Sequence, residues 1–326
     1  DDYENYIDLY QTDVYILKGG EEEIYVPPFT YHGFRYVLVE GLLPEQATED
    51  LLTYEVFNSD IKKRIDFECS DDTVNTLFDM GIAADMSNFH YFPTDCPHRE
   101  KNGWTGDAAV SAAHMLMSFD CGESLRQWLC SMRYAQRENG IIPGIVPTVG
   151  WGCKGDYGPT WDAACIELPY CIYKYDGRED VVLENADMMY KYLKYISSVR
   201  DENGLLPVGL GDWCQPGSGN VNISAPKRLT NSATVYDLAI KSAFMFEKCG
   251  RLEEMKFAQN LAAEMKTAIR KNLIDFESMT AEGACQTSQA LMLSVGLFEE
   301  DEYEKAYKRL IELIYKKDCL FNTPVY

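Results

Sequence analysis

The chain changes near residue 60 from a strand-like to a helical pattern of apolar and polar positions. Before that point lie three short runs rich in β-branched and aromatic residues: Val14–Leu17, Glu23–Val26 and Phe34–Val39. In the third run apolar and polar residues alternate, which is typical of a half-buried strand. A few strands alone have unpaired edges and little core. We therefore expect residues 1–60 to be the last strands of a β-sandwich domain plus a linker, with the earlier strands outside this chain.

After residue 60 apolar residues recur at the spacing of α-helices. The first helix is expected to begin at Ser70 as N-cap, with Asp71 and Asp72 favourable to the dipole of its first turn. Its apolar positions are Val74, Leu77, Phe78, Gly81 and Ile82. Eight further segments are predicted at Ala108–Phe119, Leu125–Ala135, Ala163–Tyr175, Met188–Ser198, Ala233–Cys249, Met255–Leu273, Gln286–Leu297 and Glu302–Tyr315. One stripe is clearly one-sided and predicts a buried face: Ala258, Leu261, Ala262, Met265, Ala268 and Ile269.

A short motif occurs twice in the helical part. ENGIIP at Glu138–Pro143 returns as ENGLLP at Glu202–Pro207, 64 residues later. Each copy follows a helical segment and leads into a glycine-rich loop with a tryptophan, Trp151 or Trp213. The repeat predicts stacked helical hairpins, which form either a solenoid or a closed ring. The loops with Trp104, Trp151, Trp161 and Trp213 would then lie on one rim, and we expect them to line an aromatic pocket.

Composition narrows the choice of partners. With 52 Asp and Glu against 30 Lys and Arg the formal charge is −22, which argues against nucleic acid and anionic membrane surfaces and favours a neutral substrate. No apolar run approaches the ~18 residues of a membrane span, and the acidic start of the chain does not resemble a signal peptide. The 11 cysteines are scattered without a CxxC pair. We expect reduced thiols in a cytoplasmic protein, with no metal and no cofactor.

The stretch YFPTDCPHREKNGWTGD, from Tyr91 to Asp107, contains the candidate chemistry. Its prolines and glycines predict a loop. Three carboxylates, a tryptophan and an arginine suit carbohydrate, because sugar faces stack on indoles and sugar hydroxyls bind charged groups. A plain solvated turn is the alternative. Hydrolysis of a glycosidic bond needs a protonated carboxyl group. Glu100 lies between Asp95 and Asp107, whose charges would raise its pKa, whereas Arg99 would lower it.

Other catalytic patterns do not occur. The chain has no nucleophile elbow, HExxH, P-loop or dinucleotide-binding motif in a strand–helix context. Its four histidines, at positions 32, 90, 98 and 114, lack metal-ligand spacing. They also do not supply the pair that a sugar epimerase would use.

The motif from Asp95 to Asp107 resembles the signature of bacterial α-L-rhamnosidases, glycoside hydrolase family 78. Matching pieces follow in order over roughly residues 13–240: Phe29–Gly41, Gly140–Pro147, Thr160–Gly177 and Gly211–Trp213. The resemblance implies an (α/α)6 barrel preceded by β-sandwich domains. Residues 61–326 would be the catalytic domain without its last helices, since twelve are needed and nine are predicted. It also implies hydrolysis of terminal α-L-rhamnosides with inversion, rhamnose-containing glycosides being the partners and homo-oligomerisation left open.

Roles transfer by position within this resemblance. Glu100 matches the general acid, and Asp95, Arg99, Trp104 and Asp107 match residues that hold rhamnose. Trp161 and Trp213 resemble aromatic walls of the pocket, and Asp162 and Asp212 either bind sugar hydroxyls or cap helices. The family's general base is a Glu beyond a segment resembling Cys319–Tyr326, and no residue of this chain matches it. Alternatives are another inverting glycosidase or a sugar epimerase with this barrel, or a non-catalytic rhamnose-binding protein.

Overall fold

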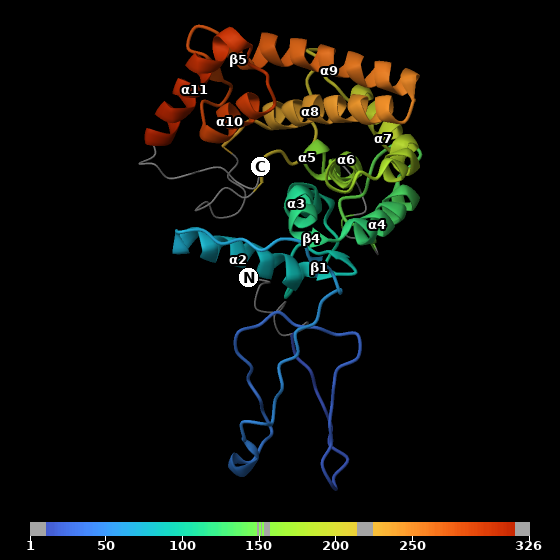
Figure 1. The fold of residues 1–326 in the computed structure, drawn as a ribbon, viewed down its shortest axis with the longest axis vertical. Helices are drawn as coiled ribbons and strands as arrows, with labels where there is room; N and C mark the ends of the chain where they lie inside the picture. Colours follow the sequence, from blue (N-terminus) through green and yellow to red (C-terminus); the bar gives the residue numbers. More distant parts are fainter. Residues whose placement is uncertain (1–10, 149, 151, 153–156, 214–223, 317–326) are drawn as a thin grey trace.

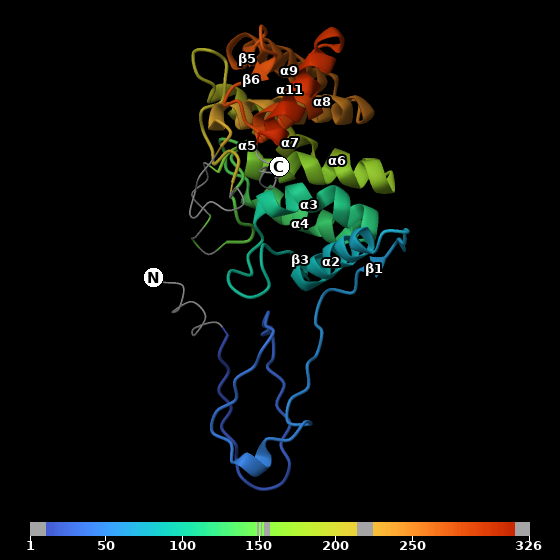
Figure 2. The ribbon, with the colours of Figure 1, turned by 90° about the vertical axis from the view of Figure 1, so that its left-hand side faces the viewer.

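The computed structural model describes residues 11–148, 150, 152, 157–213 and 224–316. Helices dominate the part of the chain after residue 70, while residues 11–60 extend away from the helical body as long loops (Figures 1 and 2). Three two-stranded ladders connect elements locally: β1 (Lys62–Lys63) with β4 (Phe119–Asp120), β2 (Phe89–His90) with β3 (Phe92–Pro93), and β5 (Ile274–Asp275) with β6 (Thr280–Ala281). No described helix has the length and apolarity needed to cross a membrane.

Four helices form a contiguous row, each packed on the next: α3 (Thr105–Ser118), α6 (Ala164–Asp176), α8 (Lys227–Lys248) and α10 (Gln286–Ser294). Each is followed in the chain by a helix of a second row: α4 (Gly122–Ala135), α7 (Glu179–Ser198), α9 (Leu252–Leu273) and α11 (Glu300–Tyr315). The pairs α6–α7, α8–α9 and α10–α11 pack together as hairpins. The remaining helices are α2 (Asp72–Asn88), the short α5 (Pro159–Asp162) and the 3₁₀-helix η1 (Pro44–Gln46).

Each of the nine predicted segments falls largely within a described helix, which confirms the periodicity. The predicted ends are less exact, since Phe119 lies in β4 and α10 ends at Ser294 rather than Leu297. The six residues of the Met255–Leu273 stripe are all buried in α9, which packs along α8. The first helix needs two corrections. Its N-cap is Asp71 rather than Ser70, because Asp71 Oδ1 accepts hydrogen bonds from Thr73 N (2.8 Å) and Val74 N (3.3 Å). Its apolar face is also only partly covered, since no residue of α2 is buried and Val74 and Leu77 are exposed.

The three runs predicted as strands also need correction. The described residues 11–60 contain no ladder, and the runs are extended without a paired neighbour. Their apolar side chains remain in solvent, with Ile16, Ile24 and Leu38 each more than four-fifths exposed: 83%, 84% and 86%. A strand persists only where a second strand satisfies its backbone and a layer covers its apolar face. The described residues supply neither.

The ENGIIP and ENGLLP copies fold alike, as the repeat predicted. In both, a glycine in the left-handed region (Gly140, φ 99°; Gly204, φ 76°) closes a tight turn after a helix. The bonds of the first copy are Gly140 N to Arg137 O (2.9 Å) and Arg137 N to Ile141 O (3.0 Å). Those of the second are Gly204 N to Asp201 O (3.0 Å) and Asp201 N to Leu205 O (2.8 Å). Each turn leads the chain back toward the row of α3, α6 and α8.

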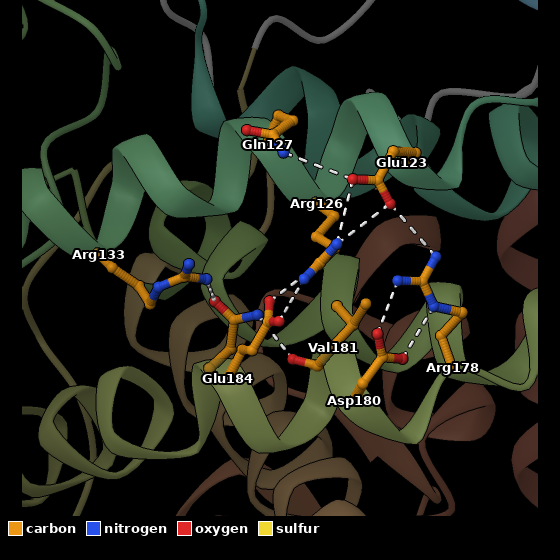
Figure 3. A network of polar contacts seen from close by, with 9 residues as sticks. Glu123, Arg126, Gln127, Arg133, Arg178, Asp180, Val181 and Glu184 are labelled. Atoms are coloured by element: carbon orange, nitrogen blue, oxygen red, sulfur yellow. Dashed lines mark hydrogen bonds and ion pairs between the residues drawn. The ribbon is translucent and has the colours of Figure 1, made fainter.

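Ion pairs on the surface connect α4 with α7 (Figure 3). Arg126 lies between Glu123 of its own helix and Glu184 of α7, donating from Nε to Glu184 Oε2 at 2.9 Å. Arg178 similarly bridges Glu123 and Asp180. Exposed pairs of this kind contribute about 0–1 kcal/mol each, so they orient the two helices more than they stabilise the fold. The buried apolar core supplies most of the stability.

Candidate active site

The loop before α3 is closed on itself by backbone bonds. Asp95 N donates to Asn102 O (3.0 Å), and Asp95 Oδ1 accepts from Asn102 N (2.9 Å). Between them the chain turns through Pro97–Glu100, and Glu100 N donates to Cys96 Sγ (3.2 Å). The loop is therefore a compact unit that holds Asp95 and Glu100 close together, as the sequence pattern required for a shared site.

A second loop fixes the first against α3. Thr105 N donates to Gly144 O (2.8 Å) and Val146 N donates to Gly103 O (2.9 Å). Gly103 permits this approach, because a Cβ there would lie only 2.3 Å from Val146 O. The segment that follows the first repeat copy is thus pinned to the start of α3, where Trp104 is the N-cap residue.

Glu100 is half-buried and hydrogen-bonded by Trp104. The indole Nε1 donates to Glu100 Oε2 at 2.6 Å. Burial raises the pKa of Glu100; the Trp104 hydrogen bond lowers it, the charge and hydrogen bond of Asp95 raise it, and Arg99 lowers it. The net shift is upward, so burial decides the competition between acidic neighbours and Arg99 that sequence could not resolve. Glu100 therefore keeps its proton to a higher pH than an ordinary glutamic acid.

Asp107 stands in the first turn of α3 and remains open to solvent on one side. Desolvation by the surrounding protein raises its pKa to about 6, and the charges of Asp95 and Glu100 add to this shift. Three carboxyl groups of one loop and helix start thus act on one another. Shifted carboxyl groups gathered in one place are a common feature of ligand sites.

Trp161 packs on the start of α3. A Cβ at Gly106 would lie 2.8 Å from the Trp161 ring, so the glycine makes room for the indole. The Trp213 ring stands edge-on to Trp161, with centroids 6.1 Å apart at 90°. The sequence placed Trp161 in a loop; it lies in the short helix α5 and is only 7% exposed, because Pro159 starts a helical turn there. Trp151 lies outside the described residues.

Asp162 and Asp212 are both 1% exposed. Neither caps a described helix, since α6 has Ala163 at its N-cap and α8 has Pro226. Burial raises the pKa of Asp212 to about 6, against the opposing effect of the Thr287 hydroxyl. Thr287 belongs to the first turn of α10, so the loop with Asp212 and Trp213 lies against that helix start.

Tyr157 is an aromatic side chain at this site that the sequence pattern did not single out. Its ring lies edge-on to Trp104, with centroids 5.3 Å apart at 82°. Its backbone oxygen accepts from Leu210 N (2.8 Å), which joins the loops before α5 and α8. The glycine that follows, Gly158, is the signal that the sequence offered. In the structure its φ is 82° and a Cβ there would lie 2.6 Å from Gly209 Cα, so the two loops cross closely at this point.

The fifth tryptophan, Trp128, lies in the hydrophobic core rather than at the site. Trp128 of α4 is 3% exposed, stacks on Phe92 (5.9 Å) and donates from Nε1 to Val146 O (2.7 Å). The site is thus built from the starts of α3, α5 and α10 and from the loop before α8. Among the described residues no group of three His, Cys, Asp or Glu side chains could hold a metal ion.

Two family models match the chain. The bacterial alpha-L-rhamnosidase 6 hairpin glycosidase domain matches residues 62–324, and the bacterial alpha-L-rhamnosidase concanavalin-like domain matches residues 3–57. An alpha-L-rhamnosidase of Formosa agariphila is 30% identical over 325 residues, which is 98% of this chain and 35% of the relative. One of Streptomyces avermitilis is 30% identical over 315 residues, or 96% and 29%. The chain thus spans about a third of these relatives' length.

Solved structures agree with the helical arrangement. The native alpha-L-rhamnosidase of Aspergillus terreus superposes with a TM-score of 0.84 at 26% identity, covering 92% of this chain and 36% of that one. The Streptomyces avermitilis alpha-L-rhamnosidase, solved in complex with L-rhamnose, gives a TM-score of 0.75 at 25% identity, covering 82% and 25%. The six-hairpin fold expected from the sequence is therefore confirmed. The preceding sandwich-type domain is confirmed by the family model over residues 3–57, although the described residues 11–60 form no ladder of their own.

Proposed function

The chain belongs to the bacterial α-L-rhamnosidase family, and from this premise we propose that the protein is an inverting glycoside hydrolase that releases terminal α-L-rhamnose from rhamnosides. The curated relatives are named alpha-L-rhamnosidases, and one similar structure was solved with L-rhamnose. The acidic surface agrees with a neutral glycoside as substrate.

Glu100 is proposed as the general acid. The observation that supports this role is its half-buried carboxyl group, held by Trp104 Nε1 beside Asp95, with a pKa raised by burial. Protonated Glu100 would give its proton to the glycosidic oxygen as the bond to the anomeric carbon breaks, so that the aglycone leaves as a neutral alcohol. The Trp104 hydrogen bond then stabilises the carboxylate that remains. The proposed base, a carboxylate that activates water on the opposite face of the sugar, is not assigned to any described residue.

The other predicted residues are proposed to bind the sugar. Asp95, Arg99 and Asp107 would hold its hydroxyl groups by charge-assisted hydrogen bonds. Trp104, Trp161 and Trp213 would form aromatic walls, with Tyr157 extending the wall behind Trp104. Asp162 and Asp212 are buried at the same helix starts, where they would set the polarity of the pocket floor.

The test of the acid is Glu100→Gln in the full-length protein, with Glu304→Gln on the exposed face of α11 as matched control. On an alkyl or weakly activated aryl α-L-rhamnoside kcat should fall by ~10²–10⁴-fold, the usual contribution of a general acid. The loss should shrink on a dinitrophenyl rhamnoside, whose leaving group needs no proton. Activity near that of the parent would remove Glu100 from the role. Calorimetric binding of rhamnose without turnover by the parent would favour a binding protein instead.

A further inference from the structure

We infer that Lys101 is a positioning residue for Glu100. It acts by anchoring the turn at Pro97–Lys101, which we call the Glu100 turn, to the segment of residues 11–33. The inference rests on the proposed role of Glu100 and extends it to a part of the chain that precedes the helical domain. It is based on four contacts between that segment and the turn, and on the backbone conformation of Lys101.

Lys101 directly follows Glu100 and has a φ of 54°. This left-handed conformation is unfavourable for a residue with a Cβ and persists only where surrounding contacts impose it. Within the loop, Asp95 and Asn102 close the base, and the Cys96 thiol accepts from the backbone of Glu100 and Lys101. None of these bonds involves the Lys101 side chain, which is held by contacts from outside the loop.

Tyr31 provides these contacts. Lys101 Nζ donates to the Tyr31 backbone oxygen at 2.5 Å and lies 4.8 Å from the centre of the Tyr31 ring. The ring in turn stacks on His90, with centroids 3.9 Å apart. Tyr31 is thus fixed to the β2 strand, and the ammonium group is bound by a carbonyl dipole and an aromatic face.

Gln11 and Gly33 contact the turn on the other side of Glu100. Gln11 Nε2 donates to His98 O at 2.7 Å and to Gly33 O at 3.3 Å. Gly33 lies so close that a Cβ there would be 3.0 Å from His98 Cβ and 3.1 Å from the Pro97 carbonyl carbon. The turn is therefore held at His98 and at Lys101, with Glu100 between the two points.

Glu100 is therefore held from two sides, by the start of α3 and by the segment of residues 11–33. Trp104 and Asp95 fix its carboxyl group from the side of α3, while residues 11–33 fix its backbone. A displacement of about 1 Å can cost about 10²-fold in rate when a catalytic group must meet one atom of the substrate. Without the Lys101 side chain the turn would lose its anchor on Tyr31, and the acid could move away from the glycosidic oxygen.

The experiment compares Lys101→Met, Lys101→Gly and Lys101→Arg with Lys308→Met, an exposed lysine of α11 paired with Glu304. All are made in the full-length protein and assayed on rhamnosides with poor and activated leaving groups. Lys101→Met should lower kcat ~10–100-fold on the poor leaving group, and far less on the dinitrophenyl rhamnoside. Lys101→Gly accepts the backbone angle but lacks the anchor, so it should show the same pattern without loss of stability. Arginine should restore part of kcat, and Lys308→Met should match the parent.

Several results would overturn the inference. Equal losses on both substrates, or a rise in KM with kcat unchanged, would make Lys101 a structural or substrate-binding residue. Full activity of Lys101→Gly would show that the anchor is dispensable. These results are separable from failure of the proposed function, because Glu100→Gln is measured on the same two substrates. If Glu100→Gln shows the leaving-group dependence and the Lys101 variants do not, Glu100 remains the proposed general acid and the positioning role of Lys101 is wrong.

Discussion

At the scale of the residue, the titration of Glu100 depends on groups that act in opposite directions. Burial and Asp95 raise its pKa, while the Trp104 indole and Arg99 lower it. Trp104 and Asp95 are both close in sequence, yet their effects differ in sign because one donates a hydrogen bond to the carboxylate and the other repels it. The two can therefore be tested as a pair.

Asp95→Asn and Trp104→Phe should shift the pH profile of kcat in opposite directions. The acid must be protonated, so kcat falls as pH rises through the pKa of Glu100. Asparagine removes a negative charge, which favours the ionised form of Glu100 and moves this alkaline limb to lower pH. Phenylalanine removes the donor to the carboxylate and moves the limb to higher pH. Profiles of kcat against pH for the three proteins check the signs, and shifts in the same direction would contradict this account of the site.

At the scale of the element, the starts of α3 and α5 are closely packed at Gly106 and Trp161. Gly106 is helical, where alanine is ordinarily more stable by about 1 kcal/mol. The Trp161 ring would, however, lie 2.8 Å from the added Cβ and cannot retreat freely, since it also packs against Trp213. The steric cost should outweigh the helical gain.

Gly106→Ala should destabilise the protein by about 1–3 kcal/mol and weaken rhamnose binding through displacement of Trp161. The matched control is Gly81→Ala in α2, where the nearest atom is His114 Nε2 at 3.2 Å, the far end of a side chain that is 39% exposed. The control should be neutral or slightly stabilising. Urea unfolding and tryptophan fluorescence measure both variants, and equal stability of the two would mean that the Gly106 contact can relax at little cost.

At the scale of the whole molecule, a partly buried ion cluster joins two neighbouring helices of the row of α3, α6, α8 and α10. Lys241 Nζ of α8 lies 2.6 Å from Glu167 Oε1 of α6 and 2.6 Å from Asp237 Oδ2 of its own helix. The three side chains are between 16% and 30% exposed. Removing the lysine would leave two carboxylates facing each other in a partly desolvated place, which costs more than losing a surface pair.

Lys241→Met should therefore lower the free energy of unfolding by ~2 kcal/mol, below the 3–5 kcal/mol of a fully buried pair because some solvent remains. Lys308→Met, which breaks the exposed pair with Glu304 on α11, should cost less than about 0.5 kcal/mol. Chemical denaturation at neutral pH compares the two. Similar losses would show that the cluster between α6 and α8 behaves as an ordinary surface pair.

The sequence by itself determined the helices and the residues of the loop before α3, which contains Glu100. Helical periodicity is local, since apolar side chains three and four apart share a face whatever the helix packs against. For the same reason the repeated ENG turns were predictable, because a glycine at the turn supplies the left-handed angle in both copies. The motif from Asp95 to Asp107 placed Glu100 beside Asp95 and Trp104 by its spacing alone.

Only the tertiary structure decided which influences on that loop prevail. Burial of Glu100, the packing of Trp161 on Gly106 and the approach of Tyr157 to Trp104 depend on loops that are far apart in the chain. The same holds for Tyr31 and Gln11, which read as part of a strand-like region and instead brace the Glu100 turn. Strand pairing is equally non-local, so the N-terminal runs satisfied the β-pattern without a partner among the described residues. Distances between segments follow from packing, which no local pattern records.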